Sequence, residues 1–189
     1  MTTFHKTAES YKQGAMTLPG KYYTNHTVLE KEIETIFLRG WLYAGHISEL
    51  TKPGYFKTIN VDKESVIILK DASGELQAFF NLCRHRGTRL CTKSKGNLSK
   101  SIQCGYHGWT YDLQGNLIGA PNMDAVADFN KSDYPLNKVQ IEEWEGFIFI
   151  NLVDYPLDFC IEFAPLFNRF SEWGIPELRV IETKSYSVN

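Results

Sequence analysis

Two short pairs of metal-binding side chains constrain this chain more than any other feature of its sequence. The first pair is Cys83 and His85, the second is Cys104 and His107, and 18 residues lie between the pairs. Each pair supplies one thiol and one imidazole. A fold that uses all four side chains must therefore bring two loops together around one site.

The way the pairs are mixed favours one kind of metal site over another. A structural zinc ion also accepts two thiolates and two imidazoles, but zinc motifs usually place like ligands together in the sequence. In an asymmetric [2Fe–2S] cluster one iron takes both thiolates and the other takes both imidazoles, so each loop gives one ligand to each iron. We predict that Cys83, His85, Cys104 and His107 are the cluster-binding and metal-binding residues, with zinc as the alternative, and we predict no catalytic residue.

The residues around the ligands carry a resemblance to a known family. Cys83–Gly87 and Cys104–Trp109, with Tyr111 and Gly115 downstream, resemble the Rieske domain of ring-hydroxylating oxygenase α subunits. Glycines next to the ligands indicate close approach of the backbone to the cluster, often with positive φ. The resemblance implies a Rieske-type [2Fe–2S] cofactor.

Composition excludes several other functions. The chain has 189 residues, 43% of them apolar, with a net charge of −2. It can therefore bury a core as one or two domains, and it has no basic signature for nucleic acid. No signal peptide or membrane-length apolar run is found, since the run Gly146–Val153 is interrupted by Asn151. We expect a cytoplasmic protein without a membrane or nucleic-acid partner, in which Cys91 and Cys160 are free thiols.

The middle of the chain reads as a series of short strands. Strands are predicted at Trp41–Ile47, Tyr55–Val61, Ser65–Lys70, Leu76–Asn81, Trp109–Asp112 and Gly146–Leu152. Their β-branched and aromatic content and the turn residues between them indicate a mainly β protein. We predict a Rieske-type antiparallel β-sandwich or small barrel with flanking α-helices, which carries the ligand pairs on loops.

Helices are predicted on both sides of the strands. Thr27 and Glu30 form a capping box, and the helix that follows is expected to end at Gly40. Its buried face is predicted to consist of Leu29, Ile33, Ile36 and Phe37.

A second helix is predicted from Pro165 to Gly174, and Arg179–Asn189 is expected to form a strand. The apolar face of that helix is assigned to Leu166, Phe170 and Trp173.

These elements suggest three regions. Residues 1–40 form an arm and helix, residues 41–154 the Rieske domain, and residues 155–189 a helix and first strand leading into a catalytic domain that is absent. In the family resembled, that domain holds a mononuclear non-haem iron with two histidines and a carboxylate. Outside the ligand pairs only His5, His26 and His46 remain. We therefore expect no second iron site in this chain.

The resemblance also implies a function and partners. It implies the electron-transfer portion of an oxidoreductase, an oxygenase α subunit, whose mononuclear iron hydroxylates or demethylates an aromatic or quaternary ammonium substrate. Electrons would come from an NAD(P)H-dependent flavin/iron–sulfur reductase or a ferredoxin, and the full-length protein would be a homotrimer. The sequences of Thr88–Cys91 and Trp144–Asn151 resemble the quaternary ammonium branch of the family more than its aromatic branch. The alternative is a freestanding Rieske ferredoxin-like electron carrier.

Basic side chains lie within and between the two ligand loops and could receive an acidic redox partner. They are Arg84, Arg86, Arg89, Lys93, Lys95 and Lys100. The alternatives are an ordinary solvated loop for Lys93, Lys95 and Lys100, and contacts with the absent catalytic domain for Arg84 and Arg86.

Overall fold

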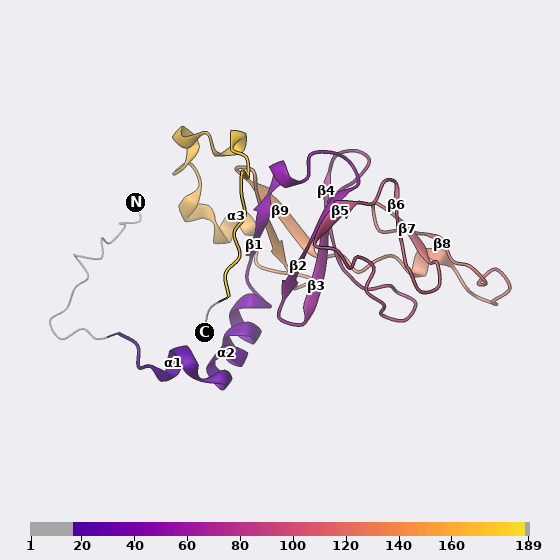
Figure 1. Cartoon of the computed structure of the whole chain (residues 1–189), viewed down its shortest axis with the longest axis horizontal. Helices are drawn as coiled ribbons and strands as arrows, with labels where there is room; N and C mark the ends of the chain where they lie inside the picture. Colours follow the sequence, from indigo (N-terminus) through magenta and orange to yellow (C-terminus); the bar gives the residue numbers. More distant parts are fainter. Residues whose placement is uncertain (1–16, 188–189) are drawn as a thin grey trace.

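The computed structural model describes residues 17–187, and their strands form three antiparallel sheets (Figure 1). The first sheet has the order β1-β10-β9, from Leu42–His46, Phe147–Asn151 and Gln140–Trp144. The second has the order β4-β3-β2-β5, from Leu76–Phe80, Glu64–Lys70, Tyr55–Val61 and Lys95–Asn97. The third has the order β6-β7-β8, from Ser101–Gln103, Thr110–Asp112 and Leu117–Gly119. The α-helices are α1 Lys21–Thr24, α2 His26–Glu32 and α3 Phe159–Glu162.

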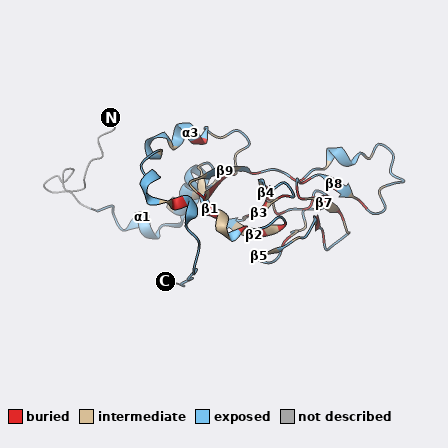
Figure 2. Ribbon diagram, turned by 90° about the horizontal axis from the view of Figure 1, so that it is seen from above, coloured by how far each residue is buried: buried red, intermediate tan, exposed pale blue. Residues whose placement is uncertain are grey.

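Strand β3 is buried on both faces and separates two hydrophobic cores. Successive side chains of a strand point to opposite faces. Ile67 and Leu69 accordingly belong to the core that contains the two cysteines of the ligand pairs. Val66 and Ile68 belong to a second core shared with the first sheet. Figure 2 shows that the helical segments near both ends of the described chain are mainly exposed.

The mainly β, antiparallel prediction is confirmed, and all six predicted strands are present with bounds shifted by at most two residues. The chain also forms four strands that the sequence did not predict, namely β5, β6, β8 and β9. Three of them have only three residues, too few for an alternating pattern to stand out. They form because a neighbouring strand supplies hydrogen-bond partners, which is a tertiary effect.

The predicted capping box at Thr27 is wrong. Helix α2 begins at His26, and the side chain of Asn25 accepts a hydrogen bond from the Thr27 backbone N–H at 2.8 Å. Asparagine caps helices at least as well as threonine, so the earlier residue takes the role. The helical segment then widens into a π-turn at Ile33–Phe37.

The predicted burial of the apolar face of this helical segment is also wrong. Leu29, Ile36 and Phe37 are 49%, 55% and 44% exposed. Helical periodicity shows that one face is apolar, but it does not say which segment covers that face. No segment within residues 17–187 buries it.

The predicted helix from Pro165 to Gly174 is wrong as a continuous element. Between Pro165 and Gly174 the chain forms short 3-10 turns at Ala164–Leu166 and Ser171–Trp173, with α3 before this range and a further turn at Ile175–Glu177 after it. Phe167 is extended, with ψ of 140°, and Asn168 has φ of +63°, so the chain leaves helical geometry there. The rings of Phe163, Phe167 and Phe170 all lie 5.8–6.4 Å from that of Trp144 in β9. Packing onto this ring overrides the local helical pattern.

The predicted strand at Arg179–Asn189 is not formed in the part of it that the structure describes. Residues 178–187 are irregular, and Ile181 is 98% exposed. A strand needs a neighbour that satisfies its backbone groups, and propensity alone cannot supply one. The last two residues of the prediction lie outside the described part.

A buried carboxylate fastens the second sheet to the third. Asp71, 3% exposed, follows β3 and accepts hydrogen bonds from the backbone N–H of Ser73 and Glu75 at 2.9 and 3.0 Å. Its other oxygen accepts from the side-chain amides of Gln77 and Gln114 at 3.1 and 3.2 Å. Gln114 lies in the turn between β7 and β8, so the carboxylate joins turns that are 43 residues apart in sequence.

We predict that Asp71 contributes stability that acid removes. Burial opposes ionisation of the carboxyl, but the hydrogen bonds from Ser73, Glu75 and Gln77 outweigh it and lower the pKa. A lowered folded pKa means that the stabilisation is complete above the unfolded pKa of about 3.9 and is lost as the pH falls through the folded value. Asp71→Ala should cost about 2 kcal/mol at pH 7. Thermal unfolding at pH 7 and at about pH 3 should show this cost shrinking in acid.

The matched control is Asp124→Ala, which removes an exposed carboxylate from the loop after β8. It should change stability little at either pH. An Asp71→Ala cost that is the same at both pH values would contradict the assignment.

No helix within residues 17–187 has the length and the apolar character needed to cross a bilayer.

Candidate metal centre

The first ligand loop, residues 83–88, follows strand β4 and closes on itself through the backbone. The Cys83 N–H donates to the Thr88 carbonyl at 2.8 Å, and the Gly87 N–H donates to the Cys83 carbonyl at 2.9 Å. Gly87 has φ of +67°, a conformation that residues with a Cβ rarely adopt. The glycine therefore makes the tight turn that brings His85 back over Cys83.

The second ligand loop, residues 104–109, repeats this pattern between β6 and β7. The Cys104 N–H donates to the Trp109 carbonyl at 2.8 Å, and the Gly108 N–H donates to the Cys104 carbonyl at 3.1 Å. Gly108 has φ of +72°, as expected from the sequence, whereas Gly105 is not in the left-handed region. Two loops of the same backbone geometry therefore face one another.

The two loops bring like side chains together. Cys83 and Cys104 are each 3% exposed and belong to the same core, where the two thiols interact. The imidazole rings of His85 and His107 lie 4.7 Å apart between centroids. His107 is exposed and His85 is half-buried. The thiols thus lie inside and the imidazoles outside.

The thiol pair and the imidazole pair match the donor set of a two-iron cluster. Within residues 17–187, no three side chains of the types His, Cys, Asp and Glu gather closely enough to hold a single ion. Two soft thiols and two imidazoles are ligand types that an iron–sulfur cluster accepts. The residues present therefore fit a [2Fe–2S] group with two cysteine ligands on one iron and two histidine ligands on the other.

Burial opposes the charged forms of Cys83 and His85. Burial raises the pKa of the Cys83 thiol, although a hydrogen bond from Tyr111 opposes part of the change. Burial also lowers the pKa of His85, and electrostatic repulsion from the neighbouring His107 and Arg86 side chains lowers it further. Because thiolates bind metal, loading the site must release protons.

Tyr111 is a functional residue whose role the sequence did not reveal. It is fully buried in β7, and its hydroxyl lies 3.4 Å from the Cys83 sulfur. The same oxygen accepts the Arg84 backbone N–H at 3.0 Å. The Tyr111 proton can therefore point at the sulfur. A tyrosine two residues after the second loop was the available signal, but nothing local connected it to the first loop.

Asn81 is a second residue whose role the sequence did not reveal, and it fixes the chain on both sides of the first loop. This fully buried side chain accepts the backbone N–H groups of Leu90 and Cys91 at 3.1 and 2.8 Å. It donates to the Cys91 carbonyl at 2.7 Å and to the Ser65 hydroxyl at 3.2 Å. A polar residue directly after an apolar strand was the only local sign of this anchor.

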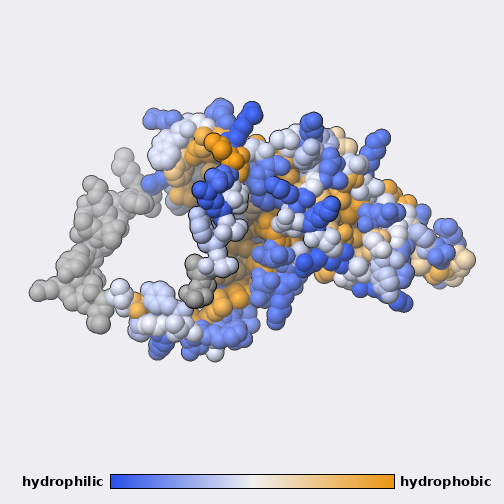
Figure 3. Space-filling view, in the orientation of Figure 1, coloured by the Kyte–Doolittle hydropathy of each residue, from blue (hydrophilic) through white to orange (hydrophobic). Residues whose placement is uncertain are grey.

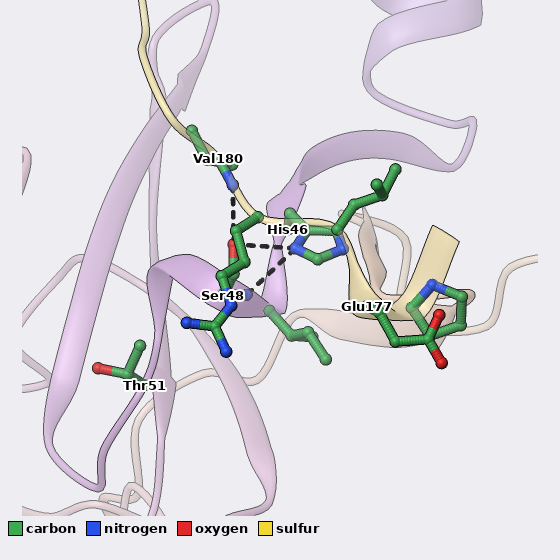
Figure 4. Close-up of a pocket in the computed structure, with 9 residues that line it drawn as sticks. His46, Ser48, Thr51, Glu177 and Val180 are labelled. Carbon is green, nitrogen blue, oxygen red and sulfur yellow. Dashed lines mark hydrogen bonds between the residues drawn. The ribbon is translucent and has the colours of Figure 1, made fainter. Parts of the chain in front are cut away.

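A separate cavity of about 440 Å³ lies beside His46, next to the second core (Figure 4). The buried His46 ring accepts the Ser48 backbone N–H at Nδ1, at 3.2 Å, so Nε2 carries the hydrogen. Nε2 has no hydrogen-bond partner in the described part of the protein. The Ser48 hydroxyl accepts the Val180 N–H at 3.1 Å, which fastens the C-terminal segment. His46 ends β1, within the strand predicted at Trp41–Ile47, and does not join the ligand pairs.

The other residues named in the sequence analysis are two cysteines and two histidines outside the ligand pairs. Cys91 and Cys160 are free thiols, as predicted, and burial raises the pKa of Cys91 to about 11. His26 is exposed, and His5 lies outside the described residues.

All six basic residues of the loop region are exposed. Arg84, Arg86, Arg89, Lys93, Lys95 and Lys100 can therefore meet a partner.

Comparisons with known proteins match the ligand loops and their surroundings. The Rieske [2Fe-2S] domain family matches residues 40–130. The chain is 38% identical to the glycine betaine monooxygenase oxygenase subunit of Pseudomonas aeruginosa over 142 residues, 75% of this chain and 33% of that protein. It is 37% identical to the biphenyl 2,3-dioxygenase subunit alpha of Rhodococcus jostii over 145 residues, 76% of this chain and 31% of that protein.

Solved structures show the same fold. The apo form of the quaternary ammonium Rieske monooxygenase CntA matches with a TM-score of 0.78 and 33% identity, over 85% of this chain and 47% of that one. Naphthalene 1,2-dioxygenase from Rhodococcus sp. matches with a TM-score of 0.73 and 30% identity, over 78% and 34%. The chain thus spans about a third of the length of the curated relatives it matches.

Proposed function

The chain belongs to the Rieske [2Fe-2S] family and is homologous to the N-terminal portion of Rieske oxygenase α subunits, and on this premise we propose that it transfers electrons for an oxygenase. Cys83 and Cys104 would hold one iron of a [2Fe–2S] cluster, and His85 and His107 would hold the other. The observation that carries this assignment is the pairing of buried thiol with thiol and of imidazole with imidazole across two matched loops. Bound there, the cluster supplies one-electron storage.

The ligand set explains why such a site can accept an electron readily. Two ferric ions and two sulfides carry two positive charges, so two thiolates and two neutral imidazoles leave the oxidised site uncharged. Four thiolates would leave a dianion, which opposes a further negative charge. This difference accounts for the higher Rieske potentials, about −150 to +300 mV against about −400 mV for plant-type clusters.

A metal and spectroscopic analysis tests the assignment. Protein purified without oxygen and reduced with dithionite should show a rhombic electron paramagnetic resonance signal, with about two irons per chain. Stoichiometric zinc without that signal would replace the redox role by a structural one. Iron and zinc measured on the same sample separate the two outcomes.

The proposed role of the whole protein is oxidation of an organic substrate with O₂. We place the substrate in the quaternary ammonium class, supported by the names of two relatives, the glycine betaine and the carnitine monooxygenase oxygenase subunits. The biphenyl dioxygenase relative at 37% identity supports the aromatic class. Oxygen uptake is measured with glycine betaine and with biphenyl, on a preparation that contains both the Rieske cluster and the mononuclear iron. The compound that stimulates oxygen uptake identifies the substrate class.

The division into residues 1–40, 41–154 and 155–189 stays part of the proposal, with 41–154 as the Rieske domain. In this division the other two regions join the Rieske domain to the catalytic part. A freestanding ferredoxin-like carrier is the second candidate. The matches to oxygenase subunits extend over 73–85% of the chain, well beyond residues 40–130, and favour the oxygenase role.

The redox partner is proposed to be an NAD(P)H-dependent reductase or a ferredoxin with an acidic surface, and the full-length protein a homotrimer. Opposite charges steer two proteins together, and salt screens the attraction. We therefore expect the rate of cluster reduction by the partner to fall roughly tenfold between low and high salt. Stopped-flow measurements at increasing ionic strength give this rate.

The double variant Lys93→Glu and Lys95→Glu should slow reduction and flatten its salt dependence. Lys63→Glu, which changes an exposed lysine in the turn between β2 and β3, is the control. A salt dependence that is equal in the double variant and the wild type would place partner docking elsewhere.

A further inference from the structure

The two candidate ligand loops are connected by the chain that leaves the second one. Trp109 closes the second loop, because its carbonyl accepts the Cys104 N–H at 2.8 Å. Its side chain reaches the first loop, where the indole lies parallel to the His85 imidazole, with 5.0 Å between centroids and 9° between planes. One residue thus contacts both loops, with its backbone on one side and its ring on the other.

The indole is itself held in place. Trp109 is 2% exposed, and its ring meets the edges of Phe129 and Tyr134 at 5.7 and 5.5 Å. Those two rings stack on each other at 5.1 Å. Closely packed aromatic side chains have few alternative rotamers. The surface on which His85 rests is therefore rigid.

Within residues 17–187, the other imidazole has no such support from the core. His107 is exposed, and its aromatic neighbour Tyr106, at 3.7 Å between centroids, is itself 60% exposed. The two imidazoles thus differ in how they are supported, because the His85 ring rests on the packed interior and the His107 ring on a surface side chain.

We propose that Trp109 is a positioning residue of the metal centre, which sets the orientation of the His85 imidazole and ties the two ligand loops together. The inference rests on the proposed cluster ligands and adds a residue that binds no metal. Groups that orient a metal ligand affect the retention of the metal as well as its electronic structure. A ring that only filled the core would affect stability alone.

Retention of the cluster against a chelator tests the proposal. Trp109→Leu should release iron to ferrozine about tenfold faster than the wild type, and Trp109→Phe, which keeps a stacking ring, should stay close to the wild type. In Trp109→Leu the paramagnetic resonance lines of the reduced centre should broaden, because His85 no longer has a single orientation. Phe129→Leu loosens the support of the indole and should give an intermediate rate even if Trp109→Leu does not fold.

Two controls separate positioning from packing. Phe149→Leu removes a buried aromatic ring from β10, away from the ligand loops. Tyr106→Leu removes the exposed ring beside His107. Both variants should release iron more slowly than Trp109→Leu. The melting temperatures of the metal-free proteins show how much each substitution lowers stability, so that this effect can be separated from the rate of iron release.

The outcomes distinguish this inference from the proposed function. A wild-type protein that binds no iron–sulfur cluster would overturn the function itself. A loaded wild type with Trp109→Leu and Phe129→Leu releasing iron no faster than Phe149→Leu would overturn the positioning role alone.

Discussion

Replacing Cys83 with serine is expected to abolish the iron–sulfur centre. A thiolate is the soft ligand that the cluster requires, and a serine hydroxyl at neutral pH is a hard, protonated oxygen. Cys83 also lies in the core, 3% exposed, where water cannot take the place of the lost ligand. The variant should contain less than about a tenth of the wild-type iron and give no rhombic resonance signal after reduction.

The chain offers two matched controls for this variant. Cys91→Ala removes a buried thiol from the same core, and Cys160→Ser changes an exposed one. Both should keep the iron content and the signal, because neither cysteine is a proposed ligand. Full iron content in Cys83→Ser, or loss of the cluster in folded Cys91→Ala, would contradict the ligand assignment.

Replacing Tyr111 with phenylalanine is expected to lower the midpoint potential of the centre. The Tyr111 oxygen accepts the Arg84 N–H, so its own proton is available for the Cys83 sulfur, 3.4 Å away. A hydrogen bond to a ligand sulfur stabilises the reduced centre more than the oxidised one, because the reduced centre carries the extra negative charge. If the variant loses about 1 kcal/mol of this preferential stabilisation of the reduced centre, the midpoint potential falls by roughly 40 mV for a one-electron couple.

The same variant should also be less stable, because the Arg84 N–H loses its partner, at a cost of about 1–3 kcal/mol. Tyr134→Phe is the matched control, since it removes a hydroxyl from the neighbouring aromatic group without touching Cys83. Protein-film voltammetry of both variants gives the potentials. A potential unchanged in Tyr111→Phe, or lowered equally in Tyr134→Phe, would show that this hydroxyl does not tune the centre.

An apolar groove lies beside the C-terminal turns of the described chain. Tyr43, Trp144, Phe147, Phe170 and Trp173 line this groove. Figure 3 shows hydrophobic surface over the same segment. The groove lies beside the first sheet, whereas the first ligand loop follows β4 of the second sheet and the second lies between β6 and β7 of the third (Figure 1).

The sequence by itself determined the local features of this protein. Spacing and residue type identified Cys83, His85, Cys104 and His107, and the structure brings them together on two loops. The alternation of apolar and polar residues and the turn residues predicted the strand Tyr55–Val61 with the bounds that the structure shows. These features depend on a few neighbouring residues, and each carries its signal within about ten positions of the chain.

Only the tertiary structure decided which distant residues complete these features. The Tyr111 hydroxyl reaches a sulfur 28 residues away, and Trp144 draws the aromatic side chains after α3 out of the predicted helix. The apolar face formed by Leu29, Ile36 and Phe37 shows the same limit, because periodicity defined the face and could not supply a covering segment. Packing and hydrogen bonding join residues by position in space, and that position depends on the whole fold.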